Sequence, residues 1–410
     1  MKYKGKNSLL FMLYAICIGA ITGLIVWCFL KIMNISIEFI WKTLPNRISI
    51  PFYTIIVCTL GGLIIGIWKK KNGDYPEELE TVIGKVKKEG RYSYHNIGAI
   101  SVSAMLPLVF GGSIGPEAGL TGVIAGLCTW VGDKFKHLFK EMKELTQIGV
   151  SATLGTIFKS PMFGFIEPIE SEKEGTALPK TPKMILYFLA IFGAFGMFVL
   201  LNHFFQGSSE MATFEGLKIG IREWIWLLPL SLMGMVAGYF YYFSRKVVIK
   251  LSSPIQNNTI IKGVLGGILL GIAGTLLPYT MFSGEHQMEE LIINWQEIGV
   301  GILLVTAIVK LLITNICIHT GLKGGHFFPC IFSGICIGYA FSILTGVNPV
   351  FCVSVITTAL MASLMKKPLA TVLLLMICFP VAAIPVMLLT AVIGSMIKLP
   401  KVLEINNEKE

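Results

Sequence analysis

Two short glycine–proline segments carry the residue types that could bind an anion inside a membrane. Each reads Gly-Gly-x-x-x-Pro, the first over 111–116 and the second over 324–329. Proline is tolerated in the first turn of a helix, and glycine lets the backbone approach a ligand closely. A helix that starts there points backbone N–H groups and the positive end of its dipole at whatever lies ahead. An anion is the natural occupant of such a helix start.

The residues between the glycines and the prolines are the candidate binding residues. Backbone N–H groups suit a conduit, because they replace hydration without a fixed full charge that would trap the ion. One copy of the motif could mark a loop and a helix start that pack for structural reasons, whereas two copies favour a site. The candidate donors are Ser113, Ile114 and Gly115 on one side, and His326, Phe327 and Phe328 on the other.

The two motifs belong to a weak internal repeat. Pro161 follows Pro116 by 45 residues and Pro368 follows Pro329 by 39, and both of the later prolines lie in a Lys-x-Pro context. Such repeats are typical of transporters, which place the substrate site at the repeat interface. We therefore expect one membrane domain over 1–398, with repeat halves of about 8–205 and 219–398, a polar tail over 399–410 and no soluble regulatory domain.

Membrane-spanning helices are the elements that must position these motifs. Only 14% of the residues are charged while 54% are hydrophobic, and the hydrophobic residues form long blocks. Several blocks reach the ~20 residues that span a hydrocarbon core of ~30 Å. Others are short or are cut by glycine and proline, as in tilted or broken helices inside a bundle. The composition predicts an all-α polytopic membrane protein.

The net charge of +10 could mark a nucleic-acid-binding protein, but the basic residues collect in short connections between the apolar blocks. Lys69, Lys70 and Lys71, for example, follow the second block directly. By the positive-inside rule these connections face the cytoplasm. We expect a multi-pass protein of the cell membrane with a cytoplasmic N-terminus, in contact with lipid and not with nucleic acid.

The sequence contains no pattern that indicates a metal site, a cofactor site or a disulfide. The nine cysteines lie in apolar stretches without a C-x-x-C pair, so we expect plain buried thiols. Glu285, His286, Glu289 and Glu290 have helical spacing but lack a third well-placed metal ligand, which favours a solvated helix end. No metal and no cofactor is expected. A membrane enzyme that uses Glu285, His286 and His319 is kept as an unfavoured alternative, because no nucleophile–base pair recurs.

The chain over about 8–398 resembles a divergent bacterial member of the chloride channel (CLC) family of anion channels and proton-coupled exchangers. Gly-Gly-His-Phe-Phe-Pro at 324–329 is similar to the family's Gly-Gly-x-Phe-x-Pro, and Gly-Ser-Ile-Gly-Pro at 112–116 to its Gly-Lys/Arg-Glu-Gly-Pro. Asn-Gly-Asp-Tyr-Pro-Glu at 72–77 stands in the place of Gly-Ser-Gly-Ile-Pro-Glu. The resemblance implies two inverted repeats, a homodimer with one pore per subunit, and a small inorganic anion, chloride first. It adds Gly73, Asp74 and Tyr75 to the anion-binding residues.

The departures from the family pattern bear on mechanism. Ile114 stands where the family carries its gating glutamate, and isoleucine can neither compete with chloride nor carry a proton. We therefore expect passive anion permeation. Glu117 is the alternative gate of a proton-coupled exchanger, or an acid favoured by the helix dipole. Gly73 replaces the usual serine hydroxyl and no tyrosine follows Tyr339, so fluoride, nitrate or bicarbonate could replace chloride.

Three further side chains have alternative interpretations. Asp74, two residues before Pro76, is expected to cap a helix start, with Tyr75 as a possible source of the missing hydroxyl. Lys310 stands alone in an apolar stretch and should face a cavity, a carboxylate or the interface. An anion-attracting role beside the pathway is one interpretation, and snorkelling or a structural ion pair is the other. His326 could make conduction depend on pH if its ring faces water.

Overall fold

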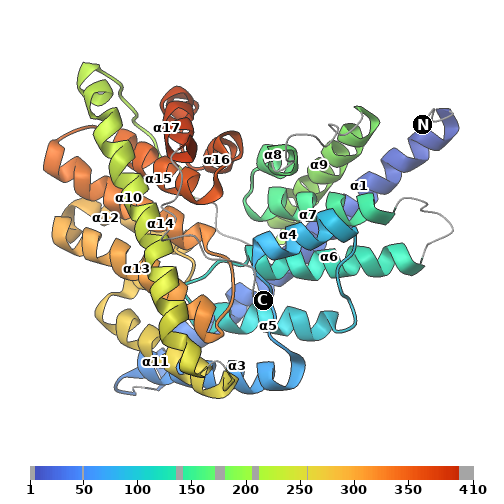
Figure 1. Ribbon diagram of the computed structural model, residues 1–410, viewed down its shortest axis with the longest axis horizontal. Helices are drawn as coiled ribbons and strands as arrows, with labels where there is room; N and C mark the ends of the chain where they lie inside the picture. Colours follow the sequence, from blue (N-terminus) through green and yellow to red (C-terminus); the bar gives the residue numbers. More distant parts are fainter. Residues whose placement is uncertain are drawn as a thin grey trace. The chain divides into compact units, whose positions relative to one another are not determined.

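The computed structural model describes residues 5–48, 50–134, 142–170, 181–205, 212–255 and 257–396 (Figure 1). Within these ranges the chain forms seventeen α-helices with short π and 3₁₀ turns, and its β-structure is limited to one isolated bridge. The predicted all-helical fold is confirmed. The predicted polar tail over 399–410 lies outside the described residues.

Two compact units, interleaved along the sequence, make up the chain. Unit 1 comprises Met1–Lys42, Tyr75–Met105 and Pro116–Ser209, and unit 2 comprises Thr43–Asp74, Leu106–Gly115 and Glu210–Glu410. The predicted repeat halves stay a prediction.

The helices of unit 1 are mostly long and apolar, and α5 starts in this unit and ends in unit 2. They are α1 (Gly5–Glu38), α4 (Leu79–Glu89), α5 (Ile97–Val109), α6 (Glu117–Lys134), α7 (Met142–Ile157), α8 (Pro161–Glu170) and α9 (Thr181–Phe205), with the π turn η1 (Phe39–Thr43) at the end of α1.

Unit 2 holds the remaining elements. They are α2 (Leu44–Arg47), α3 (Tyr53–Asn72), α10 (Ile221–Ser252), η2 (Ser253–Ile255), α11 (Thr259–Leu276), η3 (Pro278–Thr280), α12 (Glu285–Ile298), α13 (Val300–Thr320), α14 (Phe327–Thr345), α15 (Pro349–Met365), α16 (Pro368–Leu375), η4 (Val381–Ala383) and α17 (Ile384–Met396).

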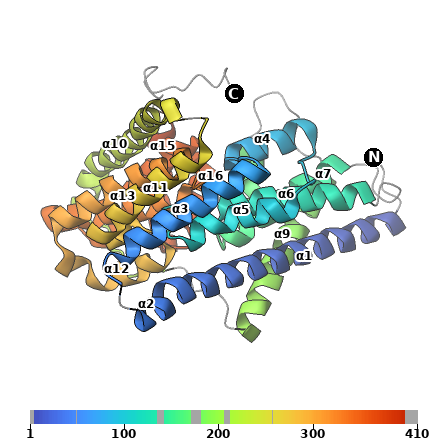
Figure 2. The same ribbon diagram turned by 90° about the horizontal axis from the view of Figure 1, so that it is seen from below.

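Small residues let helices of each unit pack backbone to backbone. In unit 1, α9 crosses behind α1 (Figure 2), where a β-carbon on Gly19 would lie 2.0 Å from the carbonyl oxygen of Ala190. In unit 2, α3 and α11 lie side by side in both views, and a β-carbon on Gly62 would lie 2.0 Å from the carbonyl oxygen of Gly263. Small residues at crossings are the usual means of helix association in a membrane.

The outward side chains of the described helices are largely apolar. On α10, Ile225, Leu228 and Val236 are each more than half exposed. Among the described residues, seven helical stretches are long and apolar enough to cross a membrane. A surface with this much exposed apolar area suits lipid. The predicted polytopic membrane protein is confirmed, but Cys17 and Cys28 of α1 are exposed, so the expectation of nine buried thiols is wrong for these two.

Candidate functional site

The first glycine–proline segment leaves helix α5 through a tight backbone turn. Gly111 has a φ of +82°, a conformation that glycine adopts without a steric penalty. The N–H of Gly112 donates to the carbonyl of Pro107 at 2.8 Å, and the N–H of Ile114 donates to the carbonyl of Gly112 at 2.8 Å. The amide of Ile114 is therefore engaged with the protein itself in this structure.

A β-bridge joins the two glycine–proline segments inside unit 2. Gly115 and Gly325 exchange both backbone hydrogen bonds in antiparallel fashion, each with an N–O distance of 2.8 Å. The two motifs, far apart in the sequence, are thus brought side by side. The amide of Gly115 donates to a protein carbonyl, so among the predicted donors the two amides of Ile114 and Gly115 are already occupied.

Ile114 is completely buried and packs on the second motif. Its Cδ1 lies 2.4 Å from the position that a β-carbon on Gly324 would take. At the predicted gate position, the chain therefore presents an aliphatic side chain fitted against a glycine.

The hydroxyl of Ser113 is directed at helix α13. Its Oγ lies 3.2 Å from Oγ1 of Thr314, and both residues are buried. Because the Thr314 hydroxyl donates to the carbonyl of Lys310 at 2.8 Å, Ser113 is the donor in the contact between the two hydroxyls. Thr314 was missed by sequence reasoning, since a threonine in an apolar helix gives no signal of its own.

Helix α14 begins at Phe327, directly after the bridge, with His326 at its N-cap position. Pro329 is the third residue of the helix, where its missing N–H costs no helical hydrogen bond. The His326 ring stacks on Tyr241 of α10 at a centroid distance of 5.3 Å and meets the Phe327 ring edge-on at 4.9 Å. Phe327 and Phe328 are both buried.

The segment around Asp74 differs from its predicted form. Helix α3 ends at Asn72, and the next helix, α4, begins only at Leu79 with Glu78 at the N-cap. Asp74 is therefore not a helix cap, and that prediction is wrong. Gly73, with a φ of +97°, closes α3 through its N–H to the carbonyl of Lys69 at 2.9 Å. Tyr75 is half-buried in unit 1.

Asp74 instead binds two lysines of unit 2. Its Oδ1 lies 2.9 Å from Nζ of Lys69, whose side chain is buried, and its Oδ2 lies 2.6 Å from Nζ of Lys323. Burial opposes ionisation of the Asp74 carboxyl, but the two ammonium groups outweigh it and lower its pKa to about 2. The two lysines neutralise the carboxylate, and the group of three residues keeps one net positive charge. Sequence reasoning missed both lysines.

Lys310 of α13 is buried, and its ammonium binds backbone carbonyls. The Nζ atom lies 2.9 Å from the carbonyl oxygen of Tyr279, 3.0 Å from that of Met281 and 3.1 Å from that of Phe282. It also lies 4.8 Å from the centre of the Phe332 ring. The prediction that Lys310 faces a cavity, a carboxylate or the interface is wrong, because η3 and the turn after it supply its partners.

Glu117, the alternative gate, is the first residue of α6 in unit 1 and is completely buried. Its backbone carbonyl accepts the hydroxyl of Thr121 at 2.6 Å. An acid that is buried at the start of a membrane helix gains from the helix dipole. It is also the kind of residue that often carries function inside a membrane.

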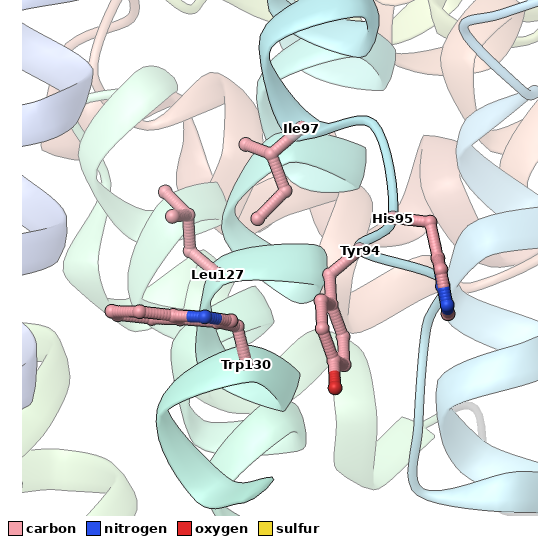
Figure 3. Close-up of a pocket in the computed structure, with 5 residues that line it drawn as sticks. All are labelled: Tyr94, His95, Ile97, Leu127 and Trp130. Atoms are coloured by element: carbon pink, nitrogen blue, oxygen red, sulfur yellow. The ribbon is translucent and has the colours of Figure 1, made fainter. Parts of the chain in front are cut away.

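A pocket of about 440 Å³ lies elsewhere in unit 1 (Figure 3). Leu127 and Trp130 of α6 face Tyr94, His95 and Ile97, which precede and open α5, and the rings of Tyr94 and His95 stack at 5.5 Å. Its lining contains none of the predicted anion-binding residues.

Comparison with known proteins gives a consistent result. The family model described as voltage-gated chloride channel matches residues 61–399. A candidate ion-transport protein, YfeO, of Escherichia fergusonii is 22% identical over 343 residues, which cover 82% of this chain and 79% of the relative. Its counterpart in Salmonella newport is 22% identical over 345 residues, which cover 82% and 81%.

Two solved structures share the fold. A CLC-type fluoride/proton antiporter superposes with a TM-score of 0.80 at 18% identity and covers 97% of this chain and 98% of its own. A slow cyanobacterial Cl⁻/H⁺ antiporter superposes with a TM-score of 0.79 at 19% identity and covers 94% of each chain. At this level of identity the likeness shows the fold alone.

Proposed function

This chain belongs to the voltage-gated chloride channel family, and we propose that it lets a small inorganic anion, chloride first, cross the membrane without coupling to protons. The observation that carries the proposal is Ile114, a fully buried aliphatic side chain at the place of the gating acid. Proton-coupled exchange needs a titratable group that alternates between the pathway and the solvent, and isoleucine cannot titrate.

The proposed binding residues are those at the starts of the two motifs and beside Asp74. His326, Phe327 and Phe328 open α14, whose positive dipole end favours an anion. Ser113, Ile114 and Gly115 would lie beside them, since the bridge at Gly115 joins the two segments, and we propose Gly73, Asp74 and Tyr75 as further anion-binding residues. Because the carboxylate of Asp74 is paired with Lys69 and Lys323, its charge would not repel the anion.

We propose that the protein is a homodimer in the cell membrane with a cytoplasmic N-terminus. The basic residues Lys69, Lys70 and Lys71 at the end of α3 support this orientation. Members of this family are channels or transporters, so we expect no catalytic turnover.

Anion efflux from liposomes that contain the purified protein tests the proposal. With a potassium ionophore to balance charge, chloride should leave the vesicles while the internal pH stays constant. Uphill proton movement driven by a chloride gradient would contradict uncoupled transport. Absence of any ionophore-dependent efflux would favour a membrane enzyme or a non-conducting protein. A competition series with fluoride, nitrate and bicarbonate would rank the anions.

Proton-coupled exchange through a relocated acid is the second candidate function, and the complete burial of Glu117 favours it. The fluoride/proton and Cl⁻/H⁺ antiporters with the same fold add weight to this alternative. If proton coupling were measured, Glu117→Gln should abolish the uphill proton movement and leave downhill anion flux in place.

A further inference from the structure

Lys310 is a buried cation whose hydrogen bonds are complete but whose charge is not compensated. An ammonium has three N–H donors and a neutral amine has two. The three carbonyl oxygens within 3.1 Å of Nζ therefore match the charged form. Among the residues that the structure describes, no carboxylate lies within ion-pair distance of Lys310. Burying an ammonium without a counter-charge costs free energy, so a function for this charge would explain why it is buried.

Three separate contacts connect Lys310 to the candidate site within unit 2. Thr314, one helical turn further along α13, accepts the hydroxyl of Ser113 and donates to the carbonyl of Lys310. Phe282, which accepts from Nζ, donates its own N–H to the carbonyl of Gly111 at 3.1 Å. The third contact is with α14, because the ring beside Nζ belongs to Phe332.

The position on α14 is informative. Phe332 follows Phe328 by four residues and so lies on the same helix face, one turn inside the start of α14. Lys310 is thus connected to both motifs. Its hydrogen-bond partners contact Gly111 and Ser113 of the first motif, and its ammonium contacts Phe332 on the helix that follows the second motif. The Lys310 ammonium is not exposed to solvent, so it would attract an anion by long-range electrostatic interaction rather than by direct contact.

We infer that the Lys310 ammonium is a fixed counter-charge that stabilises the permeating anion beside the two joined motifs. The inference rests on the proposed function. Backbone dipoles alone would hold the anion weakly, and a charge set back by one layer of protein would strengthen the site without trapping the ion. We take the distance from the ammonium to the anion as about two helical turns of ~5.4 Å each, or ~10 Å. At an effective dielectric constant of ~20, the attraction over this distance would raise anion affinity roughly tenfold over that of a site without the charge.

The test measures anion affinity in variants that keep or remove the charge. Lys310→Gln and Lys310→Met are neutral, whereas Lys310→Arg keeps the cation. Affinity is read from the chloride dependence of efflux and, independently, from the rise in Tm when chloride replaces gluconate. We expect roughly tenfold weaker binding in each folded neutral variant and a change of less than about threefold in the arginine variant.

A control variant tests whether loss of any cation weakens binding. Lys250→Met removes an exposed cation near the end of α10, and affinity should stay within about twofold.

The possible results are distinguishable. A folded neutral variant with wild-type affinity would overturn the inference, and so would an arginine variant as weak as the glutamine variant, because geometry rather than charge would then matter. If neither neutral variant folds, the arginine variant decides by the same measurement: an affinity within about threefold of the wild type supports the inference, and an affinity roughly tenfold weaker overturns it. If wild-type protein shows neither efflux nor chloride-dependent stabilisation, the proposed function fails and not only the role of Lys310.

Discussion

The side chain of Ile114 fills the space that a side chain on Gly324 would need, with its Cδ1 atom 2.4 Å from the position of the missing β-carbon. Together with the bridge between Gly115 and Gly325, this contact fixes the two motifs against each other. Residue choices at 114 and 324 are therefore coupled, although the sequence separates them by most of the chain.

The coupling predicts how the two positions respond to substitution. Gly324→Ala should lower the free energy of unfolding by about 1–3 kcal/mol through overpacking, and Ile114→Ala by about 2–5 kcal/mol through a cavity. The double variant should lose clearly less than the sum, because the alanine at 324 occupies part of the cavity. Unfolding in detergent gives all three values, and simple additivity would contradict the contact.

A titratable acid at position 114, the predicted gate position, should add a pH dependence to anion flux. In Ile114→Glu, burial would raise the pKa of the new carboxyl, so the group would be neutral in acid and charged in alkali. Anion flux should then fall by roughly tenfold as the pH rises through that pKa. Ile114→Gln has the same size and no titration, and it should show the wild-type pH profile. Identical profiles for the two variants would rule out a side chain at 114 that reaches the pathway.

Removal of the Asp74 charge should strengthen anion attraction and weaken the fold. Asp74→Asn leaves Lys69 and Lys323 with two net positive charges where the wild type has one. Half-saturating chloride should therefore decrease, as efflux over a concentration series would show. Asp74→Glu keeps the carboxylate and serves as the matched control. An unchanged half-saturating concentration in Asp74→Asn would place this group outside the anion's path.

The same carboxyl contributes to stability in acid. Its pKa in the folded protein, about 2, is lower than that of an unfolded aspartate, ~3.9. The stabilisation is therefore complete above pH ~4 and is lost as the pH falls from there to about 2. The difference in Tm between wild type and Asp74→Asn should shrink over this interval. A difference that stays constant down to pH 2 would argue against the two ion pairs in solution.

The hydroxyl of Ser113 should matter little for the anion. It donates to Thr314, so Ser113→Ala should leave chloride flux within about twofold and cost about 0.5–1.5 kcal/mol of stability. Thr314→Val removes the acceptor but keeps the Ser113 hydroxyl. Comparing the two variants therefore separates loss of the hydroxyl from loss of this hydrogen bond. If Ser113→Ala lost most of the flux while Thr314→Val kept it, the hydroxyl would be an anion ligand after all.

Close helix packing in unit 2 predicts an asymmetry between two glycine substitutions. A β-carbon at Gly263 would lie 2.3 Å from the carbonyl oxygen of Gly62, whereas one at Gly84 of α4 would meet nothing within 4 Å. Gly263→Ala should cost about 1–3 kcal/mol. Gly84→Ala should be neutral or stabilise by about 0.5–1 kcal/mol, because alanine favours the helix. Equal effects on Tm would contradict the packing of α3 on α11.

Sequence reasoning recovered those features that depend on local chemistry. Glycine and proline interrupt apolar helices for reasons of backbone geometry, so the breaks before α6 and α14 were predictable. Features made by distant partners were not. Asp74 pairs with Lys323, and Lys310 binds carbonyl oxygens of η3 and of the turn after it; nothing near these residues in the sequence indicates those partners.

The bridge between Gly115 and Gly325 also has a consequence for biosynthesis. Residue 325 follows residue 115 by 210 positions, so a ribosome that adds ~5–20 residues per second reaches it roughly 10 to 40 seconds later. During that interval the nascent chain in the membrane holds only one strand of the bridge, with two glycine hydrogen bonds still to be made. The candidate site is therefore completed late in translation.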